Sequence, residues 1–152
     1  SESRGGIIRM TNMLNKIFTG QILSGVFQFD DTIHTSEIHD ISETAHFSVY
    51  EFDGAAFNDK SGFIQHFGEV MQPPLNFIDW DFFERHLETT EWMEKDKGKV
   101  IIYKSIEHFY QANRQDFDIL IDIFESVTKF RNKRTNNITP ILFFVENITG
   151  DS

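Results

Sequence analysis

The sequence has no cysteine, only three prolines in 152 residues, and no apolar run near the roughly 20 residues that span a bilayer. Without cysteine, neither a disulfide framework nor a cysteine-ligated metal site can form, and a reducing cytosol suits such a chain. Glycine, asparagine, lysine and threonine interrupt residues 1–25, where a secretory signal would need an apolar stretch. These absences predict a cytoplasmic protein without a membrane segment.

Positive charge is also scarce. The chain has 14 lysines and arginines against 24 aspartates and glutamates, a formal net charge of −10. Nucleic-acid-binding proteins normally carry a basic footprint, so direct nucleic-acid binding is not expected. A basic protein partner fits the sign of the charge, although acidity can also serve solubility alone.

The patterns that signal catalysis are missing too. The sequence has no glycine-rich phosphate loop and no H-E-x-x-H motif, and its six histidines are scattered. The many carboxylates are not accompanied by a recognisable nucleophile or oxyanion-stabilising group. We therefore expect neither an enzyme nor a metal or cofactor site, and the sequence leaves the oligomeric state open.

What the chain does have is 17 phenylalanines, which argue for a packed interior. Apolar runs and alternating patterns predict strands at 25–29, 46–54, 99–105 and 140–146. Helical spacing predicts helices at 35–45, with Thr35 or Ser36 at its start, at 58–71 and from about Phe77. It also predicts a helix through Phe109 and Tyr110, which Ser105 can cap, and another at about 114–131. Helices between strands predict an α/β fold with a mainly parallel sheet of about four strands and crossover helices.

The end of the predicted helix at 114–131 is basic, with Lys129, Arg131, Lys133 and Arg134. Cations are favoured at the negative end of a helix dipole, which predicts a solvated helix terminus. Contact with phosphates is the alternative.

The segment FIDWDFFERHLETTEW (77–92) is both aromatic and acidic. Residues 73–96 hold seven carboxylates and two cations, a net charge of −5. On a helix, Trp80, Phe83 and Leu87 form a stripe that faces the core. Asp81, Glu84, Arg85 and Glu88 share an outward face, on which Asp81 can pair with Arg85 while Glu84 and Glu88 repel each other. Charge alone does not decide between a solvated face and a surface for a basic partner.

Several of these motifs occur in an order that resembles the barstar family of ribonuclease inhibitors. The strand that ends at Asp53-Gly54 is followed by a helix with Phe63, two prolines and Asp79-Trp80-Asp81, and then by Leu87 and Glu91-Trp92. The resemblance covers about 47–146 and implies a barstar-like fold. Residues 13–46 resemble the N-terminal strand–helix extension of longer relatives, so a single domain at 13–146 is expected.

The resemblance implies an intracellular immunity protein that binds and blocks a basic ribonuclease. In that family, the loop and helix equivalent to about 73–92 insert into the enzyme, and their carboxylates take the place of RNA phosphates. The contacts expected here are Phe77, Asp79, Asp81, Glu84, Arg85, Glu88 and Trp92.

The family's second helix aspartate is replaced here by Arg85, which a cationic active site would repel. Glu84 and Glu88, on the same face, are the candidates to replace that aspartate. The alternative is a barstar-like fold reused as a regulatory protein–protein interaction module without a nuclease partner.

Overall fold

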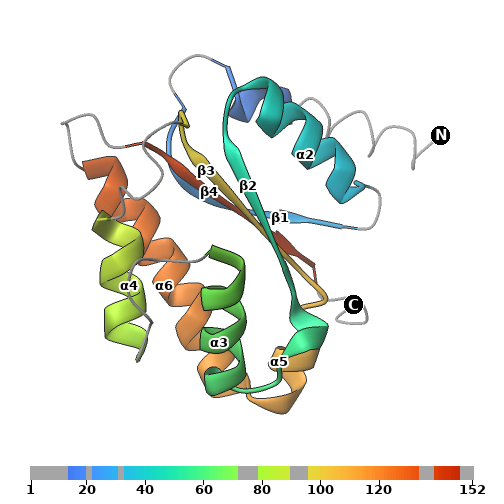
Figure 1. The fold of residues 1–152 in the computed structure, drawn as a ribbon, viewed down its shortest axis with the longest axis vertical. Helices are drawn as coiled ribbons and strands as arrows, with labels where there is room; N and C mark the ends of the chain where they lie inside the picture. The colour runs from blue at the N-terminus through green and yellow to red at the C-terminus, as the bar shows by residue number, and fades with distance from the viewer. Residues whose placement is uncertain are drawn as a thin grey trace.

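The computed structural model describes residues 14–19, 22–30, 33–71, 79–89, 96–133 and 139–147. A four-stranded sheet lies between helices on its two faces (Figure 1). After a helical turn at 14–17, the elements are β1 (Gly25–Phe29), α2 (Thr35–Thr44), β2 (Ser48–Asp53), the short 3-10 helix η1 (Gly54–Ala56), α3 (Lys60–Met71), α4 (Trp80–Thr89), β3 (Lys99–Lys104), α5 (Glu107–Ala112), α6 (Arg114–Lys133) and β4 (Ile141–Glu146).

The strands lie in the order β1-β4-β3-β2, and every neighbouring pair is parallel. The two inner strands, KVIIYK and ILFFVE, are buried along all but their last residue. Strands covered by helices on both faces are apolar throughout rather than alternating, and these two follow that rule. The predicted α/β fold is confirmed, and the described sheet is parallel throughout.

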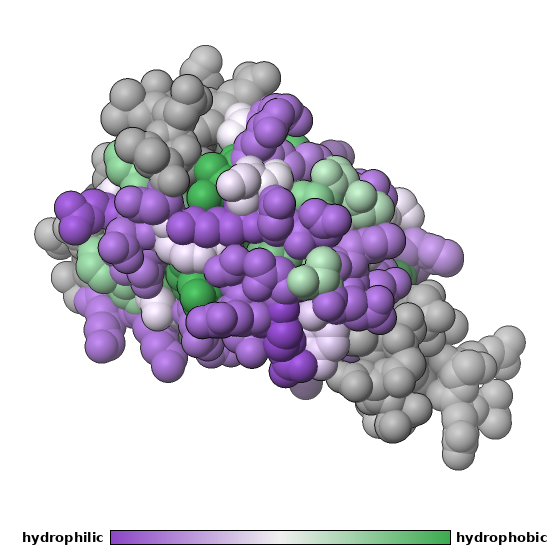
Figure 2. Space-filling model, turned by 90° about the horizontal axis from the view of Figure 1, so that it is seen from below, coloured by the Kyte–Doolittle hydropathy of each residue, from purple (hydrophilic) through white to green (hydrophobic). Residues whose placement is uncertain are grey.

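Successive residues of β3 point to opposite faces of the sheet and enter two separate cores. Ile101 and Tyr103 lie in the larger core, formed with α3, α4, α5 and α6. Val100 and Ile102 lie in the smaller core, formed with α2 and the turn at 14–17. Seen from below the view of Figure 1, the surface is mainly hydrophilic with small, separate apolar areas (Figure 2). The phenylalanine-rich interior that the composition predicts is therefore present.

The turn after β2 depends on Asp53 and Gly54. The Asp53 carboxylate accepts a hydrogen bond from the Ala55 N–H at 3.0 Å. A Cβ on Gly54 would lie 2.2 Å from the Ser105 carbonyl oxygen, so this close approach of two backbones requires glycine.

The predicted start of α2 is confirmed, whereas the predicted cap of α5 is wrong. Helix α2 begins at Thr35, and His34 at its N-cap makes no side-chain cap bond. Ser105 does not cap α5, because the helix follows Ile106 and Ser105 has a positive φ of 56°. Its N–H instead donates to the Glu146 carboxylate at 2.9 Å, a contact between residues 41 positions apart that local sequence rules cannot foresee.

Candidate functional site

Helix α4 begins with a capped N-terminus. The Asp79 carboxylate accepts a hydrogen bond from the Phe82 N–H at 2.8 Å, and the Asp79 carbonyl accepts one from the Phe83 N–H at 3.1 Å. Such a cap satisfies backbone donors that the first helical turn leaves open. Asp79 was predicted as a partner contact, and the structure gives its carboxylate this structural task at the edge of the site.

The inner face of α4 is anchored among aromatic side chains. Phe83 and Leu87 are both 0 % exposed. The Phe83 ring contacts the rings of Phe63 and Phe67 edge-on, at centroid distances of 5.4 and 4.7 Å. Trp80 is only partly buried and packs on Phe63 at 5.7 Å. The predicted inward stripe is present, with Trp80 at its margin.

The outer face of α4 carries the predicted charges. Asp81 and Arg85 are exposed, whereas Glu84 and Glu88 are partly buried. The expected Asp81–Arg85 ion pair does not occur in the described α4, so Arg85 does not neutralise Asp81 by direct contact. Partial burial raises the pKa of Glu84, and the charges of Glu88 and Asp81 raise it further. The three carboxylates therefore act as one repulsive group.

The only histidine in this helix does not offset that charge. His86 stacks on Phe82, with ring centroids 6.3 Å apart, and burial lowers the pKa of His86 below its ordinary 6.5. It is consequently neutral near pH 7.

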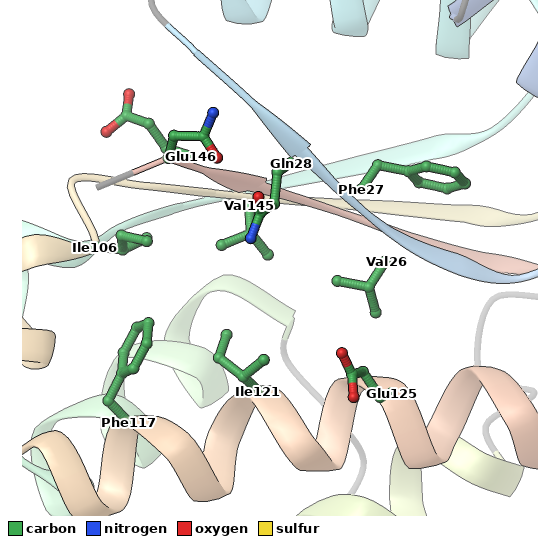
Figure 3. Close-up of a pocket in the computed structure, with 10 residues that line it drawn as sticks. Val26, Phe27, Gln28, Ile106, Phe117, Ile121, Glu125, Val145 and Glu146 are labelled. Carbon is green, nitrogen blue, oxygen red and sulfur yellow. The ribbon is translucent and has the colours of Figure 1, made fainter. Parts of the chain in front are cut away.

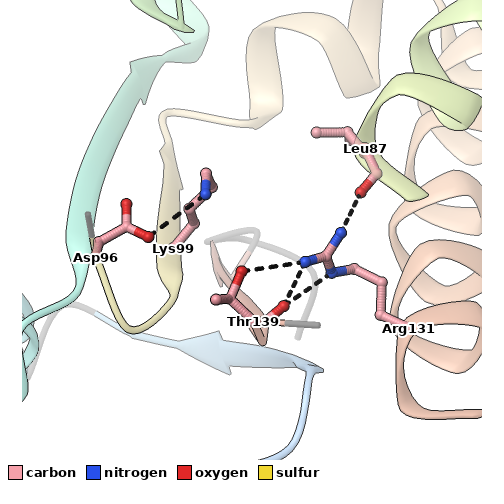
Figure 4. Close-up of polar contacts among 5 residues, drawn as sticks. All are labelled: Leu87, Asp96, Lys99, Arg131 and Thr139. Carbon is pink, nitrogen blue, oxygen red and sulfur yellow. Dashed lines mark hydrogen bonds and ion pairs between the residues drawn. The ribbon is translucent and has the colours of Figure 1, made fainter. Parts of the chain in front are cut away.

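The C-terminal end of α4 is held by Arg131 of α6 (Figure 4). The Arg131 Nη1 group donates to the carbonyl oxygens of Leu87 and Glu88 at 3.0 and 3.1 Å. The Nε group donates to the Thr139 carbonyl at 3.1 Å, and Nη2 donates to the Thr139 carbonyl and hydroxyl. A guanidinium has donors enough for both groups of acceptors, so it links α4, α6 and the segment before β4.

The predicted solvated end of α6 is therefore wrong for Arg131. Its side chain is only 4 % exposed, although Lys129 and Lys133 are exposed as expected. Arg134 lies outside the described residues. Unsatisfied carbonyls at a helix C-terminus attract cations, and α4, not α6, supplies them here.

A second buried charge lies close to Arg131. Lys99, at the start of β3, is 1 % exposed and pairs with Asp96 at 3.5 Å (Figure 4). Burial lowers the pKa of Lys99, Asp96 opposes this shift, and Arg131 lowers the pKa further. Asp96 counted toward the acidic excess of residues 73–96, but it neutralises a buried lysine. A lysine directly before the apolar run VIIY was the available signal for this pair.

The structure thus brings four predicted site residues together on one helix face and places Asp79 at the start of that helix. Phe77 and Trp92 lie outside the described residues. Within the described ranges, no cluster of histidine and carboxylate side chains is arranged to hold a metal ion. None of the described helices combines the length and apolar character needed to cross a membrane.

Comparison with known proteins agrees with this geometry. The family model described as Barstar (barnase inhibitor) matches residues 47–143, from the start of β2 into β4. No curated protein matches the chain. The matched region includes α4 and Arg131, whereas β1 and α2 precede it. The family model covers well over half of the chain, and the chain belongs to the barstar family.

Proposed function

We propose that this protein is an intracellular inhibitor, an immunity protein, that binds and blocks a basic ribonuclease through the outer face of α4. One observation carries the proposal: Asp81, Glu84 and Glu88 lie together on a helix that is anchored along its inner face and at both ends. A rigid group of carboxylates can accept charge-assisted hydrogen bonds from the arginines and lysines that would otherwise hold RNA phosphates. Membership of a family described as barnase inhibitors supports the same partner class.

The raised pKa of Glu84 adds a physical reason. Repulsion among the three carboxylates destabilises the unbound protein, and a cationic partner would relieve that repulsion. The proposed contacts are Phe77, Asp79, Asp81, Glu84, Arg85, Glu88 and Trp92. No direct contact with nucleic acid is part of this mechanism, since the carboxylates themselves stand in for the phosphates.

We also propose that residues 13–146 form one domain in which 13–46 extend the barstar-like core. Strand β1 supports this, because it pairs with β4 along its whole length, from Gly25 opposite Leu142 to Phe29 opposite Glu146. The extension is thereby part of the same sheet.

Arg85 supports a second candidate, a regulatory interaction module without a nuclease partner. This side chain is exposed in the middle of the carboxylate face and forms no ion pair in the described part of the helix. A partner that placed a carboxylate opposite Arg85 would use it, whereas a cationic active site would be repelled by it.

Neutralising the acidic face is expected to weaken ribonuclease binding. Asp81→Asn and Glu84→Gln should each raise the dissociation constant about fivefold, since each removes one exposed charge interaction of about 1 kcal/mol. The measurement is surface plasmon resonance with a purified basic ribonuclease encoded beside this chain, together with inhibition of RNA cleavage. The association rate of the unmodified chain should also fall as salt is added.

Glu43→Gln is the matched control, because Glu43 is exposed on α2 on the opposite face of the sheet. The inhibitor proposal fails if no ribonuclease encoded beside this chain binds to it. It also fails if Asp81→Asn and Glu84→Gln both bind the ribonuclease with the same affinity as Glu43→Gln. Arg85→Asp separates the two candidates: it should tighten binding to a cationic ribonuclease and weaken binding to a partner that pairs with Arg85.

Binding should also depend on pH through Glu84. Its pKa is raised above the ordinary value of 4.5, so on acidification it takes up a proton earlier than a free carboxyl group does. A cationic partner favours the ionised form, and binding must therefore release that proton. We expect the dissociation constant to rise as the pH falls from neutral toward the ordinary carboxyl value of 4.5, with a shallower rise for Glu84→Gln. Equal slopes for the two proteins would contradict this role.

A further inference from the structure

A groove of about 800 Å³ runs between the β1 edge of the sheet and α6 (Figure 3). Strands β1 and β4 form one side and α6 the other. Its apolar surface is contributed chiefly by Val26, Phe117, Ile121 and Val145. None of its lining residues belongs to α3 or α4, so the groove is separate from the carboxylate face.

The open side of this groove is an unpaired strand edge. Among the described strands, β1 pairs only with β4. In a parallel ladder the N–H and C=O of one residue point to the same side, and successive residues alternate. The Phe29 carbonyl accepts from the Asn147 N–H at 2.7 Å, so Phe29 and Phe27 face β4. The backbone groups of Val26 and Gln28 consequently point away from the sheet, where an added strand would satisfy them.

The rim of the groove is negative. Glu125 is exposed on α6, and Glu146 lies at the end of β4, where the Ser105 N–H holds its carboxylate. No lysine, arginine or histidine is among the residues that line the groove in the described structure. A strand added beside β1 turns every second side chain toward α6, so this lining complements a segment in which those positions are apolar in the middle and basic at the ends.

A second copy of this chain lacks that complementarity. A symmetric pairing of two copies through this groove would add the GVFQF strand of one copy beside that of the other, and this strand contains no basic residue. Each copy also carries a net charge of −10, so two such grooves repel each other.

We propose that this groove binds an extended, basic and apolar segment of a partner protein by adding it as a fifth strand beside β1. Backbone hydrogen bonds to Val26 and Gln28 provide the pairing, as in other cases of β-strand addition. At every second position of the segment, apolar side chains in the middle lie over Val26 and Ile121 and a lysine or arginine at each end lies near Glu125 or Glu146, while the intervening side chains point to the other face of the sheet. This inference does not depend on ribonuclease inhibition.

The test uses the full chain and a short, fluorescently labelled lysine–valine peptide, blocked at both ends, in which valines in the middle and lysines at the ends occupy every second position and serines occupy the others. Hydrogen exchange measured by NMR should show the Val26 and Gln28 amides slowed about tenfold or more by the peptide, with α4 amides unchanged. Glu125→Lys should weaken binding about fivefold, because it replaces an attraction with a repulsion. Glu43→Lys, the same charge change on the other face of the sheet, should bind like the unmodified chain.

Three results would overturn the proposal. One is equal binding of a glutamate–valine peptide, and another is unaltered binding of the lysine–valine peptide to Glu125→Lys. The third is a homodimer, seen by analytical ultracentrifugation and disrupted by Glu125→Lys, which would make a second copy the occupant. Glu84→Gln should leave peptide binding unchanged, so this result and the ribonuclease result can be told apart.

Discussion

Replacing Arg131 with methionine is expected to lower the free energy of unfolding by about 3 kcal/mol and to loosen the C-terminal end of α4. The substitution leaves the buried or partly buried carbonyls of Leu87, Glu88 and Thr139 without the guanidinium that bonds to them. Hydrogen bonds to charged groups contribute about 1.5–3 kcal/mol each, and the removal of a repulsive neighbour of Lys99 offsets part of their loss. Urea unfolding measures the stability, and hydrogen exchange of the α4 amides measures the loosening.

Two substitutions on the same helix serve as controls. Arg131→Lys keeps the charge but lacks the planar fork, so it should recover only part of the lost stability. Lys129→Met removes an exposed cation and should change the stability by less than about 0.5 kcal/mol. If Arg131→Met were as stable as Lys129→Met, Arg131 would not hold α4 in place. Ribonuclease binding should weaken in step with the exposure of the α4 amides, because the carboxylates then lose their fixed positions.

Replacing Asp96 with asparagine is expected to lower the free energy of unfolding by about 3 kcal/mol near neutral pH. The substitution removes the negative charge that pairs with buried Lys99 at 3.5 Å, while the nearby positive charge of Arg131 remains. Breaking a buried ion pair on one side commonly costs about 3–5 kcal/mol, and loss of the lysine's proton limits the cost here.

The pH dependence of this variant has a definite sign. The pKa of Lys99 lies below its ordinary value in the folded protein, so the unfolded chain binds more protons in the interval between the two values. Stability therefore rises with pH across that interval. Asparagine removes the attraction that raises the pKa of Lys99, which extends the interval to lower pH. Unfolding free energies measured between about pH 7 and 10 should climb more steeply for Asp96→Asn than for the unmodified chain.

A double-mutant cycle with Lys99→Met completes this test. Once the buried ammonium is gone, Asp96→Asn should cost much less and the added pH dependence should vanish. Parallel pH profiles for Asp96→Asn and the unmodified chain would show that the pair does not act as described.

The fold could be predicted because its signals are local. The apolar runs of β3 and β4 and the helical spacing of Phe83 and Leu87 each report burial within one element. The alternation of strands and helices then implied crossover connections and a parallel sheet. The helix caps were less accessible, since His34 and Ile106 stand where sequence rules favour a serine or threonine.

The candidate site was predictable in part. Helical spacing correctly grouped Asp81, Glu84, Arg85 and Glu88 on one face, because neighbours on a helix depend only on positions along the chain. The resemblance named Asp79 as a partner contact, and the structure shows that its carboxylate also caps the helix. The helix-dipole argument treated Arg131 as solvated, since no local signal shows that the carbonyl it binds belongs to Leu87, 44 positions earlier in the chain.

By itself, then, the sequence determined the order of elements, the two faces of α4 and the resemblance to one family, all of which follow from residue types and short spacings. Only the tertiary structure decided which charges are buried and what they hold. It placed Arg131 against the end of α4, brought Asp96 to Lys99, and left the edge of β1 without a second partner strand among the described residues, beside an acidic groove. The energy of a charge interaction depends on the distance between the charges and on their burial. In a parallel sheet, crossover connections bring distant parts of the sequence together, so these distances and the burial of each group are determined only when the chain has folded.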